Sequence, residues 1–99
     1  MLVVRDVFHC KPGKVRAMVE KFTAMKKIGE KGGLGSMKIM TDVSGPNFWT
    51  IVAEMEVESL EKFMAMDSNA ELAKEFEQIM KGYHDLVDSG HREIYTLEG

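Results

Sequence analysis

Four turn-forming residues in a row, Ser44-Gly45-Pro46-Asn47, separate two segments in which side chains of contrasting polarity alternate. The first segment covers residues 36–43 and the second covers residues 48–57. A period of two is typical of β-strands, because successive side chains of a strand point to opposite faces of a sheet. Two such segments joined by a tight turn predict a β-hairpin in the middle of the chain.

Two further strands and one helix are predicted around this hairpin. Residues 2–10 are rich in valine and phenylalanine, and residues 91–98 form a second short segment of strand character. Between the first strand and the hairpin, apolar residues recur at helical spacing over residues 14–28. Pro12-Gly13 is expected to end the first strand, and the glycine-rich residues 29–35 are expected to end the helix.

Two helical stretches follow the hairpin. The first shows i, i+3, i+4 spacing at Leu60, Phe63 and Met64. The second carries an apolar stripe from Leu72 to Tyr83, and Ser68 with Glu71 matches the capping box that begins many helices. Ser89-Gly90 is expected to end this helix before the last strand.

This order of elements predicts an α+β chain with the ferredoxin-like βαββαβ fold. Right-handed crossovers place the first strand between the third and the fourth, in a four-stranded antiparallel sheet with the second strand at an edge. Both helical layers then cover one face of the sheet. At 99 residues the chain has little room for a second domain, so residues 1–99 are expected to form a single domain.

The predicted sheet carries apolar side chains on both faces. The face toward the helices is expected to hold Trp49, Ile51, Ala53, Met55 and Val57 with Val4, Phe8 and Cys10. The opposite face is expected to hold Phe48, Val52, Val3 and Val7 with Arg5, His9 and Glu54. This second face is too apolar to be left in water, and a second copy of the sheet is its simplest cover. We therefore expect a homodimer in which two sheets pack face to face as a barrel.

Asp6 does not fit this alternation. Its parity places it toward the helices, where an unpaired charge is costly. Either a β-bulge turns Asp6 outward, or a lysine or arginine of the first helix pairs with it. The alternation alone does not decide between these two explanations.

Arg5, His9 and Glu54 are the first candidate site residues. Arg5 and His9 share one side of a central strand, and Glu54 lies on the same predicted face of the neighbouring strand. Because they converge on a half-apolar interior, they could hold a small anionic or carbonyl ligand. The alternative is a structural ion pair between Arg5 and Glu54, within one chain or across the dimer.

Further candidates for a ligand site are His84, Trp49 and Tyr95. His84 falls near the end of the last helix, where it faces either a cavity or the solvent. Trp49 and Tyr95 are large enough to line a cavity, and the alternative for both is a place in the core. No histidine has a Cys or His three or four residues away, so no metal site is expected. Cys10 is expected to be a small buried apolar residue.

Charge and composition argue against several classes of protein. A net charge of −3 and an isoelectric point near 5.6 argue against a nucleic-acid-binding protein. No apolar run reaches the roughly 18 residues of a membrane span, and no signal-peptide core is visible. A single cysteine favours a reducing, cytoplasmic location. The first third is basic and the remainder acidic, a pattern that solvated helix faces explain, although it could also steer a charged partner.

Several short motifs resemble those of a known family. They are Arg5, Lys11-Pro12-Gly13-Lys14, Thr41-Asp42-Val43-Ser44-Gly45-Pro46-Asn47-Phe48-Trp49, Glu54 and Arg92-Glu93-Ile94-Tyr95. In their order and spacing, these motifs resemble small bacterial members of the NIPSNAP family, which is part of the dimeric α+β barrel superfamily. The resemblance implies the fold, a homodimer, and a cavity between the sheet and the helices.

The same superfamily includes cofactor-independent monooxygenases of antibiotic biosynthesis and haem-degrading monooxygenases, so three functions stay open. The first is binding of a small, partly apolar molecule without a cofactor, with Arg5, His9 and Glu54 as polar contacts. The second is a monooxygenase in which His9 or His84 serves as the base, or His84 as a haem ligand. The third is a structural or interaction module that uses the polarised charge. Whether any reaction is catalysed is left open by the sequence.

Overall fold

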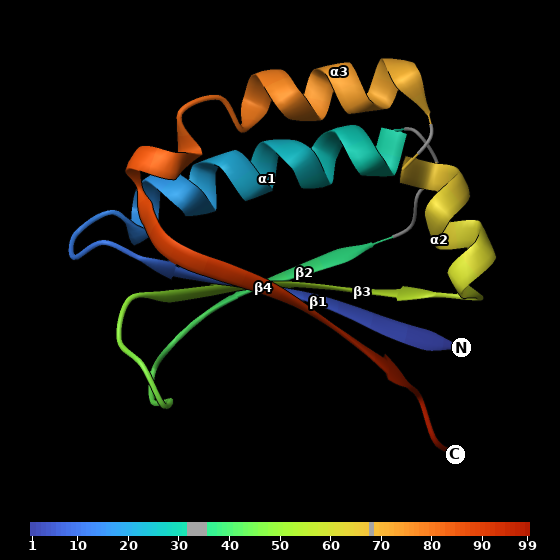
Figure 1. Cartoon of the computed structure of the whole chain (residues 1–99), viewed down its shortest axis with the longest axis horizontal. Helices are drawn as coiled ribbons and strands as arrows, with labels where there is room; N and C mark the ends of the chain where they lie inside the picture. Colours follow the sequence, from blue (N-terminus) through green and yellow to red (C-terminus); the bar gives the residue numbers. More distant parts are fainter. Residues whose placement is uncertain (32–35, 68) are drawn as a thin grey trace.

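The chain folds into a four-stranded antiparallel sheet with its helices on one side, as Figure 1 shows. The computed structural model describes residues 1–31, 36–67 and 69–99. In chain order the elements are β1 (Leu2–Cys10), α1 (Val15–Lys31), β2 (Met37–Thr41), β3 (Thr50–Val57), α2 (Leu60–Asp67), α3 (Ala70–Ile79), the 3-10 turn η1 (Tyr83–Asp85) and β4 (Val87–Thr96). No helix among these residues is long and apolar enough to cross a membrane.

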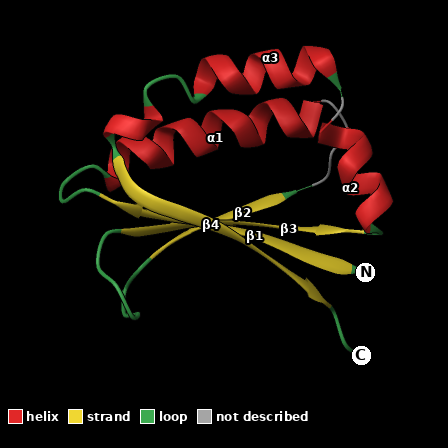
Figure 2. Cartoon of the chain, viewed as in Figure 1, coloured by secondary structure: helices red, strands yellow, loops and turns green. Residues whose placement is uncertain are grey.

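The strand order is β2-β3-β1-β4, so β1 lies between β3 and β4 and β2 takes an edge. All three pairs of neighbouring strands are antiparallel. Figure 2 shows the helices on one face of the sheet and no helix on the other face. The structure therefore confirms the ferredoxin-like βαββαβ fold that the order of elements predicts. We refer to the two sides of the sheet as the helix-covered face and the open face.

The core lies between the helix-covered face and α1. Met18 and Phe22 of α1 are almost fully buried, and they pack with Cys10, Ile51 and Ala53 of the sheet. A second buried cluster joins Val4, Val57 and Phe63 near α2. These positions confirm the strand alternation, because the buried residues of β1 and β3 in both clusters have the parity expected to face the helices.

Polar caps hold α3 at both of its ends. At its start, the side-chain oxygen of Asn69 accepts a hydrogen bond from the backbone N–H of Leu72, at 3.2 Å. Ser68, the predicted capping residue, lies outside the described residues. At the other end, the Lys21 ammonium of α1 donates to the carbonyl oxygens of Ile79 and Lys81, both at 2.9 Å. A cation on the last carbonyls satisfies acceptors that no helical N–H reaches, and it ties α3 to α1.

The predicted boundaries of α3 and of the last strand are wrong. The helix ends at Ile79, the 3-10 turn η1 follows, and β4 begins at Val87 rather than at residue 91. Gly90 therefore lies inside a strand, directly opposite Phe8. A Cβ atom on Gly90 would lie 2.5 Å from Cδ1 of Phe8, which is closer than atoms can approach. Gly90 makes room for an aromatic ring on the neighbouring strand and does not end a helix.

The hairpin is confirmed, but its strands are shorter than predicted. β2 ends at Thr41 and β3 begins at Thr50, and the connection between them extends toward the open side of the sheet (Figure 1). Trp49 was expected to face the helices, but its φ is +60° and its side chain is 44% exposed. A left-handed backbone at Trp49 interrupts the strand alternation, so parity does not place its side chain.

The first helix is longer than predicted, since α1 continues to Lys31. Gly29 was expected to begin a break, yet it is a buried residue of the helix. The glycines from 32 to 35 lie outside the described residues.

Candidate functional site

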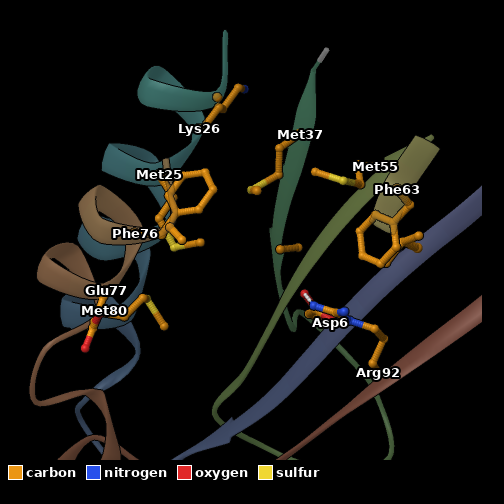
Figure 3. Close-up of a pocket in the computed structure, with 14 residues that line it drawn as sticks. Asp6, Met25, Lys26, Met37, Met55, Phe63, Phe76, Glu77, Met80 and Arg92 are labelled. Carbon is orange, nitrogen blue, oxygen red and sulfur yellow. Dashed lines mark hydrogen bonds and ion pairs between the residues drawn. The ribbon is translucent and has the colours of Figure 1, made fainter. Parts of the chain in front are cut away.

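A cavity of about 390 Å³ lies between the sheet and the helices. Its walls are mainly apolar, and Figure 3 shows the largest apolar side chains, which come from the helices and from the sheet, gathered around one space. They are Met25, Met37, Met55, Met80, Phe63 and Phe76. Methionine side chains are flexible and polarizable, so such a wall adapts its shape to an apolar molecule. The volume falls in the range of small-molecule sites, which is roughly 300–1,000 Å³.

Small residues on three elements leave this space open. Gly29 of α1, Ala53 of β3 and Ala73 of α3 all line the cavity. Each contributes little or no side-chain volume to the wall of the cavity. The periodicity of the sequence identifies the apolar stripes, but it does not show that short side chains on three separate elements meet at one place.

Asp6 and Arg92 form an ion pair in the cavity wall, and Figure 3 shows the two side chains in contact. Nε of Arg92 donates to Oδ1 of Asp6 at 2.6 Å, and a terminal nitrogen donates to Oδ2 at 3.2 Å. The guanidinium also lies 5.0 Å from the centre of the Phe63 ring. This pair explains the position of Asp6, and neither of the two expectations is correct. Asp6 stays in regular register on the helix-covered face, and its partner comes from β4 instead of the first helix. Arg92 lies directly opposite Asp6 on β4.

Lys26 adds a second cation to the cavity. It is partly buried on α1, and within the part of the chain that the structure describes its ammonium has no ion pair or hydrogen bond. The neighbouring Lys27 is exposed and does not line the cavity. Glu77 of α3 lines the cavity too, and in Figure 3 its carboxylate is turned away from the methionine side chains.

Arg5 and Glu54 form the ion pair that the sequence offers as the alternative to a ligand site. Nε and a terminal nitrogen of Arg5 donate to Oε1 of Glu54, at 3.0 and 2.7 Å. Glu93 lies 3.7 Å from the same guanidinium, and the ring centre of Tyr95 lies 5.6 Å from it. The hydrogen bond to Glu54 raises the pKa of Arg5, because it stabilises the charged guanidinium.

His9 lies on the open face as predicted, but its neighbours are Thr50 and His91 instead of Arg5 and Glu54. Its Nδ1 is 3.4 Å from the hydroxyl oxygen of Thr50, and its ring centre is 6.1 Å from that of His91. His91 lies 2.8 Å from the carboxylate of Glu93, and this contact is the main cause of a lowered pKa for Glu93. His91 and Glu93 were missed as members of this group because the predicted last strand was not assigned to faces.

The structure thus brings Arg5, Glu54 and Tyr95 together and places His9 further along the same face. None of these four residues lines the cavity, which lies on the other side of the sheet. The charged residues that do line the cavity were not among the predicted site residues, although the parity of Asp6 placed it on the helix-covered side.

His84, Trp49 and Cys10 stand apart from the cavity. His84 is exposed in η1, and its ring centre lies 4.0 Å from that of Tyr83. Because His84 does not line the cavity, its position does not fit a haem ligand there. Cys10 is buried as expected, and burial raises the pKa of its thiol. Across residues 1–31, 36–67 and 69–99, no three His, Cys, Asp or Glu side chains are grouped as metal ligands.

No protein-family model and no curated protein matches this sequence. Solved structures with the same fold include two proteins of the NIPSNAP type. An uncharacterized NIPSNAP-like domain protein from Burkholderia xenovorans has a TM-score of 0.77 at 18% identity, over 98% of this chain and 84% of that one. A NIPSNAP family protein with unknown function from Agrobacterium tumefaciens has a TM-score of 0.76 at 19% identity, over 95% and 85%.

A third similar structure is a putative antibiotic biosynthesis monooxygenase from Nitrosomonas europaea. Its TM-score is 0.70 at 15% identity, over 97% of each chain. At such identities a structural match establishes the fold, and function has to be argued from the site. Over nearly its whole length, this chain has the α+β fold of solved NIPSNAP-family proteins.

Proposed function

We propose that this protein binds a small, partly apolar molecule in the cavity between the sheet and the helices. The observation that carries the proposal is a space of about 390 Å³ enclosed mainly by methionine and phenylalanine side chains. Burial of apolar surface contributes about 25 cal/mol per Å² and is the main driving force for filling such a space. The adaptable walls favour a class of related molecules over a single shape.

Binding fits the geometry better than the monooxygenase alternative, although a monooxygenase is among the similar structures. The alternative requires a base near the substrate, and His9 or His84 were its candidates. Among the described residues that line the cavity there is no histidine. The carboxylate of Asp6 already accepts two hydrogen bonds from Arg92, one on each oxygen, so it is engaged with Arg92 rather than turned to a substrate.

We further propose that the protein is a homodimer in which two open faces pack together. Val52 and Val7 face each other across β3 and β1 on this side, and none of the helices that the structure describes covers them (Figure 2). In Figure 1 the β2–β3 connection and the C-terminal end both extend below the sheet, away from the helices, so they flank the space next to the open face. A second sheet in that space would bury the Arg5–Glu54 pair.

A fluorescence titration with the neutral apolar dye N-phenyl-1-naphthylamine tests the cavity. We expect saturable binding, weakened on the order of tenfold by Ala73→Phe, which places a ring in the cavity wall. The matched control is Ala70→Phe, because Ala70 lies on the same helix and outside the cavity lining. Absence of dye binding, or binding that Ala73→Phe leaves unchanged, would overturn the proposal.

Light scattering tests the dimer. We expect the unmodified protein to have the mass of two chains at micromolar concentration, and Val52→Lys to have the mass of one. A charge at Val52 would have to be buried between the two sheets. Gln78→Lys is the control, since it adds the same charge to an exposed position of α3. A single-chain mass for the unmodified protein would refute the dimer.

A further inference from the structure

The charged side chains that line the cavity differ in whether they are already paired or can still bind a ligand. Asp6 and Arg92 neutralise each other through two hydrogen bonds, at 2.6 and 3.2 Å. Glu77 is exposed, and Figure 3 shows its carboxylate turned outward. Lys26 is different, because it is partly buried and has no partner among the described residues. Among the described residues that line the cavity, Lys26 is therefore a positive group that no carboxylate neutralises.

We propose that the ligand of this cavity is an apolar molecule with one acidic group, and that Lys26 binds that group. This inference rests on the proposed function, since it specifies the ligand of the same cavity. Carboxylates, sulfonates and ionised phenols share the required chemistry, which is a negative oxygen that accepts a hydrogen bond from an ammonium.

The layout of the cavity supports a ligand with its charge at one end. In Figure 3, Lys26 lies opposite Met37, at the end of the cavity away from Asp6 and Arg92. The apolar body would lie among the methionine and phenylalanine side chains, and the acidic group would lie at the Lys26 end. The flexible stem of a lysine allows its ammonium to follow acidic groups of different shape, whereas an arginine fixes a planar geometry.

Two related dyes measure separately how the acidic group and the apolar body of a ligand contribute to binding. One is the neutral N-phenyl-1-naphthylamine, and the other is 8-anilinonaphthalene-1-sulfonate, which adds a sulfonate to the same ring system. We expect Lys26→Met to weaken binding of the sulfonate on the order of tenfold, as for loss of a charged hydrogen bond, and to leave the neutral dye unchanged. Methionine keeps most of the length of the unbranched side chain and removes the ammonium, with its charge and its hydrogen-bond donors.

Lys27→Met is the matched control, because it removes the same charge from the next, exposed residue of α1. If Lys27→Met weakens the sulfonate as much as Lys26→Met does, general electrostatics explains the preference and the inference is overturned. It is overturned equally if Lys26→Met leaves the sulfonate unaffected or weakens both dyes alike. Failure of the neutral dye to bind, or its indifference to Ala73→Phe, instead overturns the proposed function itself.

Discussion

Two ion pairs on consecutive residues of β1 lie on opposite faces of the sheet. Arg5 pairs with Glu54 at 2.7 Å on the open face, and Asp6 pairs with Arg92 at 2.6 Å on the helix-covered face. In a single chain their exposures are comparable, since the side chains are 38% and 19% exposed in the first pair, and 31% and 46% in the second. Their geometry alone does not distinguish them.

The difference between the two pairs lies in what covers them. A second copy on the open face would remove the Arg5–Glu54 pair from water, whereas the Asp6–Arg92 pair stays beside a cavity that solvent or ligand can fill. The contribution of an ion pair depends strongly on its solvation, and breaking a buried pair costs far more than breaking an exposed one. If a second copy covers the open face as proposed, assembly sets the importance of each pair more than hydrogen-bond length does.

Glu54→Gln is expected to have the largest effect. It leaves Arg5 without its main partner, and in a dimer with covered faces this should lower the free energy of unfolding by about 3 kcal/mol. Urea denaturation followed by circular dichroism measures the change. Glu56→Gln is the control, because Glu56 is exposed on the same strand and face. A loss below about 1 kcal/mol would indicate that water reaches the pair.

Gly90→Ala tests packing on the helix-covered face. The new Cβ atom would meet the Phe8 ring, which is held between Phe22 and Tyr83 with ring centres 5.6 and 5.9 Å away. We expect a loss of about 2 kcal/mol of unfolding free energy from this overpacking. Gly45→Ala should be close to neutral in the same measurement, since nothing lies within 4 Å of its Cβ position. Equal stabilities would mean that Phe8 moves aside freely.

Asp6→Asn should have a smaller effect than Glu54→Gln. The pair is partly exposed in the single chain and stays so in the proposed dimer, so we expect a loss of about 1 kcal/mol or less. A double-mutant cycle with Arg92→Met in thermal denaturation isolates the coupling between the two side chains. A coupling as large as the loss of stability expected for Glu54→Gln would show that the ion pairs on the two faces contribute equally.

The smallest expected effect is a pH dependence from Glu93 on the open face. Its hydrogen bond with His91 lowers its pKa, with contributions from Tyr95 and Arg5. The folded protein then holds this proton more weakly than the unfolded chain, where the pKa is about 4.3. The stability from Glu93 is complete above that value and is lost as pH falls through the lower, folded pKa. His91→Gln should flatten this acid-side slope in urea titrations, and an unchanged slope would contradict the assignment.

Much of the fold follows from periodicity and turn chemistry. The alternation around Ser44–Asn47 predicts the hairpin, and the helical spacing over residues 14–28 predicts α1 with its buried Met18 and Phe22. The Arg5–Glu54 pair follows from parity on neighbouring strands, because antiparallel register places them side by side. Such features depend on residues close in sequence or on strand pairing that the topology already requires.

The cavity and its charges do not follow in this way. The partner of Asp6 could not be predicted because the last strand was assigned neither to faces nor to a register with the first strand, so nothing placed Arg92 opposite Asp6. Gly90 was misread because a glycine ends helices more often than it accommodates a ring from a neighbouring strand. Lys26 lies off the apolar stripe of the first helix and near its negative end, where a lysine is normally solvated, so the pattern did not predict its place in the cavity wall.

The sequence by itself determined the order of elements through local periodicity, and the strand order followed from that order through the right-handed crossover rule. Alternation along β1 and β3 also determined which side of these two strands packs on the helices. Only the tertiary structure decided where Gly29, Ala53 and Ala73 meet to leave a cavity, and which charges line it. A cavity is space left between elements far apart in the chain. Its shape depends on how side chains of different elements fit together, and this information is not contained in the pattern of any one element.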